Sequence, residues 1–258
     1  MILENRKIWI TGASFGIGFE LAKALLQKNN SLVLTARSKT SLQQLQSEFP
    51  GQVTVVCCDL SRENSAEELK AALAQQCEYL DTVILNAGIC EYVDINNLDM
   101  ALVDRVTQTN YLGFVRSLYA ALPLLRNSKD APHIVGVSSA SAYIGLPRAQ
   151  AYGSSKAAMR HFLQSLRVDI FSEGIDVSIV YPGFVDTRLT RANDFEMPFQ
   201  LTTQQAVSRI IKGLEKRKKE IAFPKRLIWP LRILSMLPAA VYTELGQKIV
   251  RQETASQH

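Results

Sequence analysis

The chain has 258 residues, of which 47% are hydrophobic and 21% charged, values typical of a globular protein with a sizeable core. Its formal net charge is +5, and most of the excess falls within residues 212–232, where eight Lys or Arg accompany two Glu. The rest of the chain is nearly neutral, which excludes a general nucleic-acid-binding surface.

The four cysteines, at positions 57, 58, 77 and 90, show no CxxC spacing. We expect them to be core thiols in a reducing compartment, and we expect neither disulfides nor a metal site. A first strand that starts by Lys7 leaves no room for a signal peptide, and no apolar run is long enough to span a bilayer. These features predict a cytoplasmic protein.

A glycine-rich turn joins the first predicted strand, residues 7–11, to a helix with apolar spacing over residues 19–26. Gly12 permits a tight turn, Gly16 lets the backbone approach a pyrophosphate, and Gly18 lets the helix pack on the strand. The free N–H groups and the dipole of the helix N-terminus favour phosphate there. The alternative is an ordinary turn between a strand and a helix.

The second predicted strand, residues 31–35, leads into Ala36, Arg37, Ser38 and Lys39. In a dinucleotide-binding unit this strand end faces the adenosine ribose, where an acidic residue accepts a hydrogen bond from the 2′-hydroxyl. A guanidinium suits a 2′-phosphate instead, so the sequence favours NADP(H) over NAD(H). The alternative is a solvated basic turn.

The third and fourth predicted strands cover residues 53–58 and 82–85. Asp59 follows the third strand, where it can accept from an adenine amino group or cap a helix that begins near Glu63. The fourth strand ends at residues 86–88, whose two small residues allow a ligand to approach the backbone closely.

A long helix is predicted from about Asp99 to Arg126, with Asn110 in its middle. Asparagine is unfavourable inside a helix, so two explanations remain for Asn110. Its side chain has a polar function in a site, or it is an interior amide whose hydrogen bonds are satisfied within the fold.

Tyr152 and Lys156 are four residues apart on a helix predicted over residues 150–172, so they share one face. An ammonium group beside a phenol favours the phenolate and lowers its pKa. The fifth strand, residues 133–139, ends at Ser139, at the edge where α/β sheets bind ligands. A solvated helix face also explains the Tyr–Lys spacing when it is taken alone.

The last predicted elements are a strand at 176–181 ended by Pro182 and Gly183, a lid-like loop at 184–203, a helix at 204–216 and a strand at 220–223. Strands that alternate with helices predict an α/β fold with a doubly wound parallel sheet of about seven strands and helices on both faces. We expect one domain over 1–258, with a core at about 5–223 and a helical tail at 224–258.

Taken in order, these motifs resemble those of the short-chain dehydrogenase/reductase family over roughly residues 5 to 223. The matching residues are Thr11-Gly12-Ala13-Ser14, Gly16, Gly18, Asn86-Ala87-Gly88, Asn110, Ser139, Tyr152, Lys156, Pro182-Gly183 and Thr187. The resemblance implies a Rossmann-like sheet with strand order 3-2-1-4-5-6-7.

The resemblance also implies a catalytic tetrad. Tyr152 is expected to exchange a proton with a carbonyl or alcohol oxygen, and Lys156 to lower the pKa of Tyr152 and hold the nicotinamide ribose. Ser139 is expected to bond the substrate oxygen, and Asn110 to hold a water that connects Lys156 to solvent. In this family His133 and His161 have no role, so both are expected to be structural or surface residues.

The same resemblance implies a cofactor site for NADP(H). Its expected residues are Gly12, Ser14, Phe15, Gly16, Ile17, Gly18, Arg37, Ser38, Asp59, Leu60, Asn86, Ala87, Gly88, Tyr152, Lys156, Pro182, Gly183, Val185 and Thr187. Val185 and Thr187 resemble groups that fix the nicotinamide carboxamide. Phe15 departs from the pattern, because some NADP-preferring members place a basic residue there.

The expected function is NADPH-dependent reduction of an apolar or lipid-like ketone or aldehyde; a non-catalytic NADPH-binding or sensing protein is the alternative. The tail at 223–238 mixes bulky apolar groups with cations, so it forms a pocket wall and subunit contact or rests peripherally on an anionic membrane. The helices of Asn110 and Tyr152 carry more apolar groups than one buried stripe needs, which predicts a homodimer or homotetramer.

Overall fold

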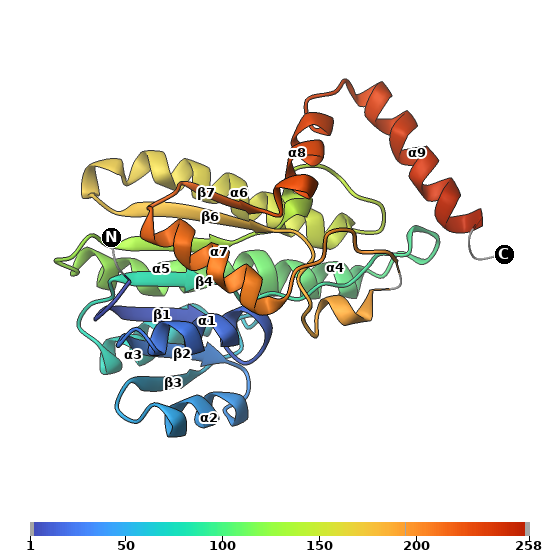
Figure 1. Ribbon diagram of the computed structural model, residues 1–258. Coiled ribbons are helices and arrows are strands. Elements are labelled where there is room, and N and C mark those ends of the chain that lie inside the picture. The colour runs from blue at the N-terminus through green and yellow to red at the C-terminus, as the bar shows by residue number, and fades with distance from the viewer. Residues whose placement is uncertain (1–2, 194, 256–258) are drawn as a thin grey trace.

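Seven parallel strands form one sheet in the order β3-β2-β1-β4-β5-β6-β7 (Figure 1). The structure is a computed structural model and describes residues 3–193 and 195–255. The strands are β1 Lys7–Thr11, β2 Ser31–Ala36, β3 Val53–Cys57, β4 Thr82–Leu85, β5 His133–Val137, β6 Asp176–Pro182 and β7 Glu220–Phe223. The predicted strand order is confirmed, and the strand ends lie within two residues of the predicted ones.

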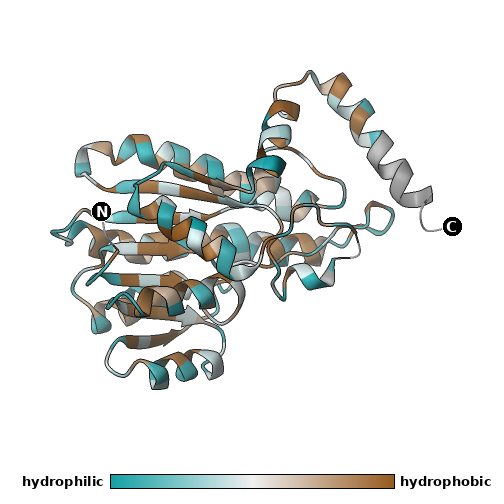
Figure 2. Ribbon diagram, in the orientation of Figure 1, coloured by the Kyte–Doolittle hydropathy of each residue, from teal (hydrophilic) through white to brown (hydrophobic). Residues whose placement is uncertain are grey.

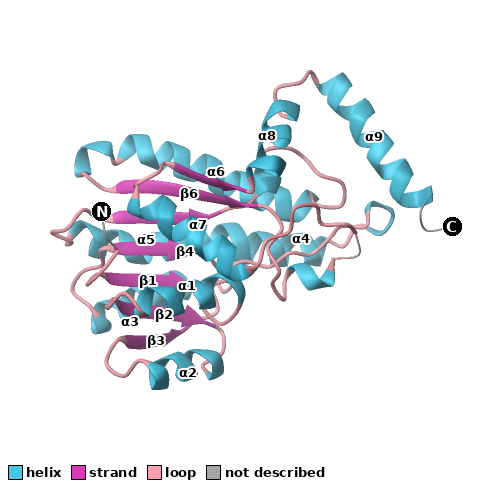
Figure 3. Cartoon of the chain, in the orientation of Figure 1, coloured by secondary structure: helices cyan, strands magenta, loops and turns pink. Residues whose placement is uncertain are grey.

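Helices cover both faces of the sheet (Figure 3). They are α1 Gly16–Leu26, α2 Thr40–Glu48, α3 Ser65–Gln76, α4 Met100–Thr107, α5 Gly113–Arg126, α6 Gln150–Asp169, α7 Thr203–Glu215, α8 Lys225–Leu234 and α9 Ala239–Ala255. Helices α1, α2 and α7 pack on one face, and α3, α5 and α6 pack on the other. The doubly wound architecture therefore matches the expectation.

The core is divided into two layers by the sheet, because successive side chains of a strand point to opposite faces. In β1, Ile8 and Ile10 pack in the layer beneath α1, and Trp9 packs in the opposite layer with α3 and α5. The strands are apolar almost throughout, as Figure 2 shows, which is required of parallel strands that are buried on both faces.

The predicted continuous helix from Asp99 to Arg126 is wrong in one detail. Helices α4 and α5 are joined by a π-helical turn, Gln108–Leu112, in which the Gly113 N–H reaches back to the Gln108 carbonyl. This hydrogen bond spans five residues, one more than in an α-helix. Asn110, which lies in the π-helical turn, is completely buried. Such turns occur often at functional sites, and periodicity alone does not reveal them.

The expectation of four core thiols is also wrong for two cysteines. Cys58 and Cys77 are buried, but Cys57 is exposed and Cys90 is half-buried. Cys57 is the last residue of β3, which is the edge strand of the sheet. All four thiols are free, as expected.

His133 opens β5 and lies in the core, far along the strand from its carboxyl end. Its Nε2 is 2.7 Å from Ser178 Oγ, which donates to the Lys218 carbonyl at 2.7 Å. Ser178 must therefore accept from an Nε2–H group, which leaves His133 Nδ1 as an unprotonated nitrogen with no hydrogen-bond partner among residues 3–193 and 195–255. Burial, with Arg217 and Arg6 nearby, lowers the His133 pKa to about 3.

The tail after β7 contains α8, which packs on the body, and α9, which projects away from it (Figure 1). Ile228 and Leu231 of α8 are buried in the core layer of α5 and α6. The Tyr242 hydroxyl of α9 donates to the Gly145 carbonyl. Across the described residues, no helix combines the length and hydropathy that a membrane span requires.

Candidate active site

The turn between β1 and α1 is built from positions that only glycine fits. Gly12 has φ +67°, and a Cβ there would lie 2.7 Å from the Ala87 Cα. Gly16, at the start of α1, has φ +61°. A Cβ at Gly18 would lie 2.3 Å from the Gly12 carbonyl oxygen. The roles predicted for a tight turn and for close packing of helix on strand agree with this geometry.

Hydrogen bonds fasten this turn to the end of β4. Thr11 Oγ1 accepts from the backbone N–H groups of Asn86 at 3.1 Å and Ala87 at 3.2 Å. Asn86 Nδ2 donates to the Thr11 carbonyl at 3.2 Å and the Gly12 carbonyl at 3.1 Å. No side chain caps the N-terminus of α1, which follows Phe15. The first amides of the helix thus face the turn and suit a phosphate.

The residues expected to contact the adenosine part of a cofactor lie beyond β2 and β3. Arg37 and Ser38 are exposed after β2. Asp59 accepts from Ser61 N at 3.0 Å and Ser61 Oγ at 2.7 Å. Burial raises the Asp59 pKa, but these hydrogen bonds and the charges of Arg37 and Arg62 outweigh it, so the pKa is lowered.

The alternative in which Asp59 caps a helix is wrong, because α3 begins later than expected, at Ser65, and the Asp59 carboxylate is engaged with Ser61. Leu60 is buried with its side chain in the core, so only its backbone can face a cofactor. The same holds for Val185 at the opposite end of the site.

A trough runs from the glycine turn to the ends of β5 and β6. Its inner part is lined by Ile17, Asn86, Gly88, Val137, Ser138, Ser139, Tyr152, Lys156, Pro182, Gly183, Val185, Thr187, Leu189 and Thr190. Its outer part is lined by Gly12, Phe15, Gly16, Ile17, Asn86, Ala87, Gly88, Thr187 and Leu189. Most predicted cofactor residues therefore meet in one trough, and its glycine cradle fits a dinucleotide. Arg37, Ser38, Asp59 and Leu60, which are expected at the adenosine end of a cofactor, line neither part, and Ser14 and Gly18 also line neither part.

Lys156 is buried at the floor of the trough, and its Nζ donates to the Val137 carbonyl at 3.0 Å. Burial lowers its pKa to about 8, although the Cys90 thiol acts in the opposite direction. Ser138 Oγ donates to the Lys156 carbonyl at 2.9 Å, which ties α6 to the end of β5. The ammonium group is 5.9 Å from the centre of the Tyr152 ring.

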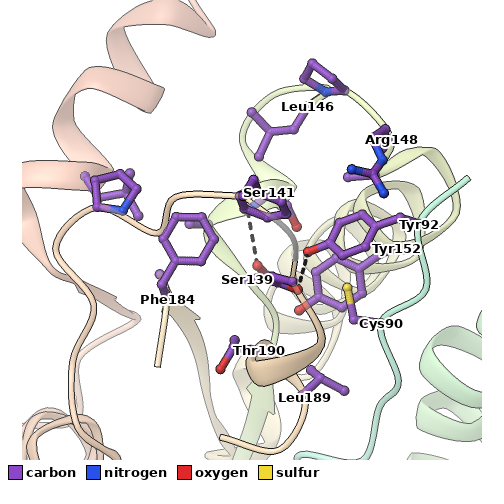
Figure 4. A pocket seen from close by; sticks show the side chains of 18 of the residues that line it. Cys90, Tyr92, Ser139, Ser141, Leu146, Arg148, Tyr152, Phe184, Leu189 and Thr190 are labelled. Atoms are coloured by element: carbon purple, nitrogen blue, oxygen red, sulfur yellow. Dashed lines mark hydrogen bonds between the residues drawn. The ribbon is translucent and has the colours of Figure 1, made fainter. Parts of the chain in front are cut away.

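Tyr152 and Ser139 lie together where the trough opens into a larger cavity (Figure 4). Ser139 Oγ accepts from the Ser141 N–H at 3.2 Å and is hydrogen-bonded to the Tyr152 side chain. Burial and the Cys90 thiol raise the Tyr152 pKa, and the hydrogen bond to Ser139 only partly offsets them. The lowered pKa that we predicted is therefore not found here, because burial dominates and Lys156 bonds to a backbone carbonyl.

Asn110 is held rigidly beside this group. Its Oδ1 accepts from Ile89 N at 2.8 Å, and its Nδ2 donates to the Ile89 carbonyl at 2.9 Å and to Ser155 Oγ at 3.0 Å. A Cβ placed at Gly88 would lie 3.2 Å from both Asn110 Oδ1 and Lys156 Nζ. The π-helical turn thus places the Asn110 amide and the Lys156 ammonium on the same side of Gly88.

The larger cavity has a volume of about 380 Å³ and mostly apolar walls (Figure 4). Its lining comes from four segments distant in the chain, two of which are the predicted lid and the predicted tail. The lining residues outside the predicted site are Cys90, Tyr92, Ala140, Ser141, Leu146, Pro147, Arg148, Ala149, Phe184, Leu189, Thr190, Asn193, Phe195, Glu196, Pro198, Leu227 and Leu231. Sequence reasoning missed those from residues 90–92 and 140–149, where it found no signal. Within the described ranges no group of His, Cys, Asp or Glu could hold a metal ion.

The sheet topology, the glycine cradle and the Ser–Tyr–Lys group define a dinucleotide-binding oxidoreductase. Residues 6–197 match the family model for short chain dehydrogenases. An "uncharacterized oxidoreductase" of Myxococcus xanthus is 34% identical over 250 residues, which cover 96% of this chain and 98% of that protein. The chain therefore belongs to the short-chain dehydrogenase/reductase family and is an NAD(P)-dependent oxidoreductase, as the motifs implied.

Other relatives are more distant. The 11-beta-hydroxysteroid dehydrogenase 1A of Arabidopsis thaliana is 32% identical over 209 residues, which cover 79% of this chain and 59% of that protein. A solved short chain dehydrogenase from Burkholderia cenocepacia in complex with NADP has a TM-score of 0.82 at 24% identity, with 95% of this chain and 99% of that chain covered. A Burkholderia phymatum structure in complex with NAD has a TM-score of 0.81 at 18% identity, with 90% and 93% covered. Both structures confirm the fold.

Proposed function

We propose that this protein uses NADPH to reduce an apolar or lipid-like ketone or aldehyde to an alcohol. One observation carries the proposal: the trough that fits a dinucleotide meets an apolar cavity at Tyr152 and Ser139. A carbonyl placed at this junction would lie between the proton donor and the nicotinamide end of the trough. The cofactor supplies the hydride, and the protein supplies orientation and a proton.

In this proposal Tyr152 is the general acid that gives a proton to the carbonyl oxygen of the substrate. Ser139 donates to the substrate oxygen and positions it, and its own oxygen is held by the Ser141 N–H. Lys156 holds the nicotinamide ribose, and Asn110 holds a water that passes protons from solvent toward Lys156. Asn110 Oδ1 keeps a second lone pair for that water.

NADP(H) is preferred over NAD(H) in this proposal because Arg37 and Ser38 are exposed after β2 with no acid at position 36. The solved relatives include complexes with NADP and with NAD, so the preference rests on these side chains. The substrate class rests on the apolar cavity and on relatives named for dehydrogenation of hydroxysteroids, which are apolar alicyclic compounds.

The test is a screen of NADPH oxidation by the purified full chain over aldehydes, ketones and 3-oxoacyl thioesters that differ in apolar surface. We expect turnover that increases with the apolar surface of the carbonyl compound. Tight NADPH binding without turnover across the panel would favour the alternative, a non-catalytic NADPH-binding or sensing protein. Turnover with NADH alone would overturn the choice of cofactor.

We also propose a homodimer, or a homotetramer built from it, in the cytoplasm, with residues 1–258 as one domain. A groove on α6 is lined by Tyr111, Ala157, Ala158, His161, Phe162, Ser165, Leu166 and Asp169. Its apolar side chains remain partly exposed although α6 already packs on the sheet, which supports a second buried face. Light scattering at micromolar concentration tests this: a monomer would contradict it, and Ala158→Arg should dissociate a dimer.

A further inference from the structure

Helix α8 presents apolar side chains on two opposite faces. Leu227 and Leu231 line the cavity. Trp229 and Ile233 follow them by two residues, which places them on the opposite side of the helix, and each is 59% exposed. Met236, just beyond the helix, is 82% exposed. One face thus completes the cavity wall, and the other presents exposed apolar side chains.

Cations accompany this outer face, and acids are absent from it. Lys225 and Arg226 are exposed in the first turn of α8, and residues 221–243 contain no Asp or Glu. Arg232 is turned toward the body, where it donates to the Tyr143 hydroxyl at 2.8 Å and pairs with Glu220. The next helix, α9, projects from the body and adds exposed Val241 and Leu245.

We propose that this outer face docks on an anionic lipid bilayer. We call it the tail face and define it by Lys225, Arg226, Trp229, Ile233 and Met236. A segment with exposed bulky apolar groups, a tryptophan, flanking cations and no acids matches the chemistry of the boundary between lipid headgroups and acyl chains. The positive charge complements anionic headgroups. A protein partner offers no such match along the whole face.

Docking of the tail face would hold the cavity about one helix diameter from the lipid surface, because Leu227 and Leu231 line the cavity from the opposite side of the same helix. An apolar substrate dissolved in the bilayer would then be concentrated close to the cavity. This part rests on the proposed function, whereas the docking does not depend on it. Docking without carbonyl reduction would overturn the proposed activity alone, and reduction without docking would overturn the tail face alone.

The first test uses the unaltered full chain. It is sedimented with vesicles of phosphatidylcholine alone and with vesicles of phosphatidylcholine mixed with phosphatidylserine. We expect binding to the anionic vesicles that weakens as salt is added. Trp229 reports the contact directly by a blue shift of its emission, because Trp9, the other of the two tryptophans, is completely buried. Protein that stays in solution with anionic vesicles would overturn the proposal.

The second test compares variants. Trp229→Ser with Ile233→Ser should weaken vesicle binding at least about tenfold. Lys225→Gln with Arg226→Gln should weaken binding to anionic vesicles about fivefold for each cation removed. The matched control is Val168→Ser with Phe171→Ser, two side chains that are 74% and 81% exposed elsewhere on the molecule. Circular dichroism and NADPH titration check that each variant is folded.

Two outcomes of the variant test would overturn the proposal. One is equal vesicle binding by the Trp229/Ile233 variant and by the Val168/Phe171 control. The other appears in light scattering without lipid: if the Trp229/Ile233 variant forms a smaller assembly than the wild type, the tail face is covered by a second copy of the chain.

Discussion

The trough and the cavity meet at Tyr152, but they are built in different ways. The trough depends on backbone: Gly12 and Gly18 occupy positions where a Cβ collides with other main-chain atoms, and Thr11 and Asn86 bond to main-chain groups. The cavity depends on side chains brought from loops and from the tail. Changes in the cavity can therefore alter what the protein accepts without disturbing the fold, whereas changes in the trough disturb both cofactor binding and stability.

The largest effect is expected at the junction of the two regions. Tyr152→Phe removes the proposed proton donor and keeps the ring, so turnover should fall about 10²- to 10⁴-fold while NADPH affinity is nearly unchanged. Initial rates of NADPH oxidation and fluorescence titration of NADPH measure the two quantities. The control is Tyr92→Phe, whose hydroxyl lines the cavity but bonds to Asn193 Oδ1 at 3.0 Å. Similar losses in both variants would contradict the assignment of Tyr152.

The next effect should be confined to the trough. Arg37→Asp replaces the guanidinium proposed to pair with the 2′-phosphate, so the preference for NADPH over NADH should shift about 10- to 100-fold and reverse. The specificity constants for both cofactors measure the shift, with Lys39→Asp, another exposed cation of this turn, as the control. A wild type that already prefers NADH would refute the reasoning from Ala36 and Arg37.

The rigidity of the trough can be tested through stability. At Gly18 a Cβ would lie 2.3 Å from the Gly12 oxygen and 2.5 Å from Asn86 Nδ2. Gly18→Ala should therefore lower the free energy of unfolding by about 1–3 kcal/mol and weaken NADPH binding. In contrast, among the described atoms outside the chain neighbours and the backbone of α9, none lies within 4 Å of a Cβ at Gly246, so Gly246→Ala should be neutral or slightly stabilising. Urea denaturation of the two variants gives the comparison.

The smallest effect is expected in the cavity. Ser141 Oγ is buried in the cavity wall and has no hydrogen-bond partner within the described part of the chain. We expect it to bond a second oxygen on the substrate, so Ser141→Ala should raise KM about fivefold for a ketone with such an oxygen and leave a plain ketone of equal size unaffected. An equal loss with both ketones would indicate disturbance of Ser139 instead.

The two regions also differ in how far sequence predicts them. The alternation of strands and helices and the glycine turn of the trough follow from local patterns, because an apolar strand, a glycine turn and a helix specify their own geometry. The strand order was implied by the family resemblance. The π-helical turn at Asn110 was missed because its helical periodicity looks uninterrupted. Tyr92 and Leu146 of the cavity were missed because each lies on a loop, and tertiary packing alone brings these loops together.

The direction of the Tyr152 pKa shift was predicted wrongly for a related reason. Spacing places Lys156 on the same helix face, but it says nothing of the Val137 carbonyl that takes the ammonium group, or of the burial that raises the pKa. Sequence thus identifies which side chains meet, and the structure decides the balance between their charges and their burial.

His133 should lower the stability of the folded protein in acid, although it takes no part in the proposed reaction. The folded state keeps this imidazole neutral down to about pH 3, whereas the unfolded chain binds a proton near pH 6.5. As the pH falls through this window, the unfolded state binds a proton that the folded state does not bind. The free energy of unfolding should therefore fall by about 1.4 kcal/mol per pH unit. Denaturation at pH 7 and pH 5 should show a smaller loss for His133→Gln than for the wild type, and exposed His161→Gln should behave like the wild type. One nitrogen at the start of β5 would thereby make the fold less stable in acid.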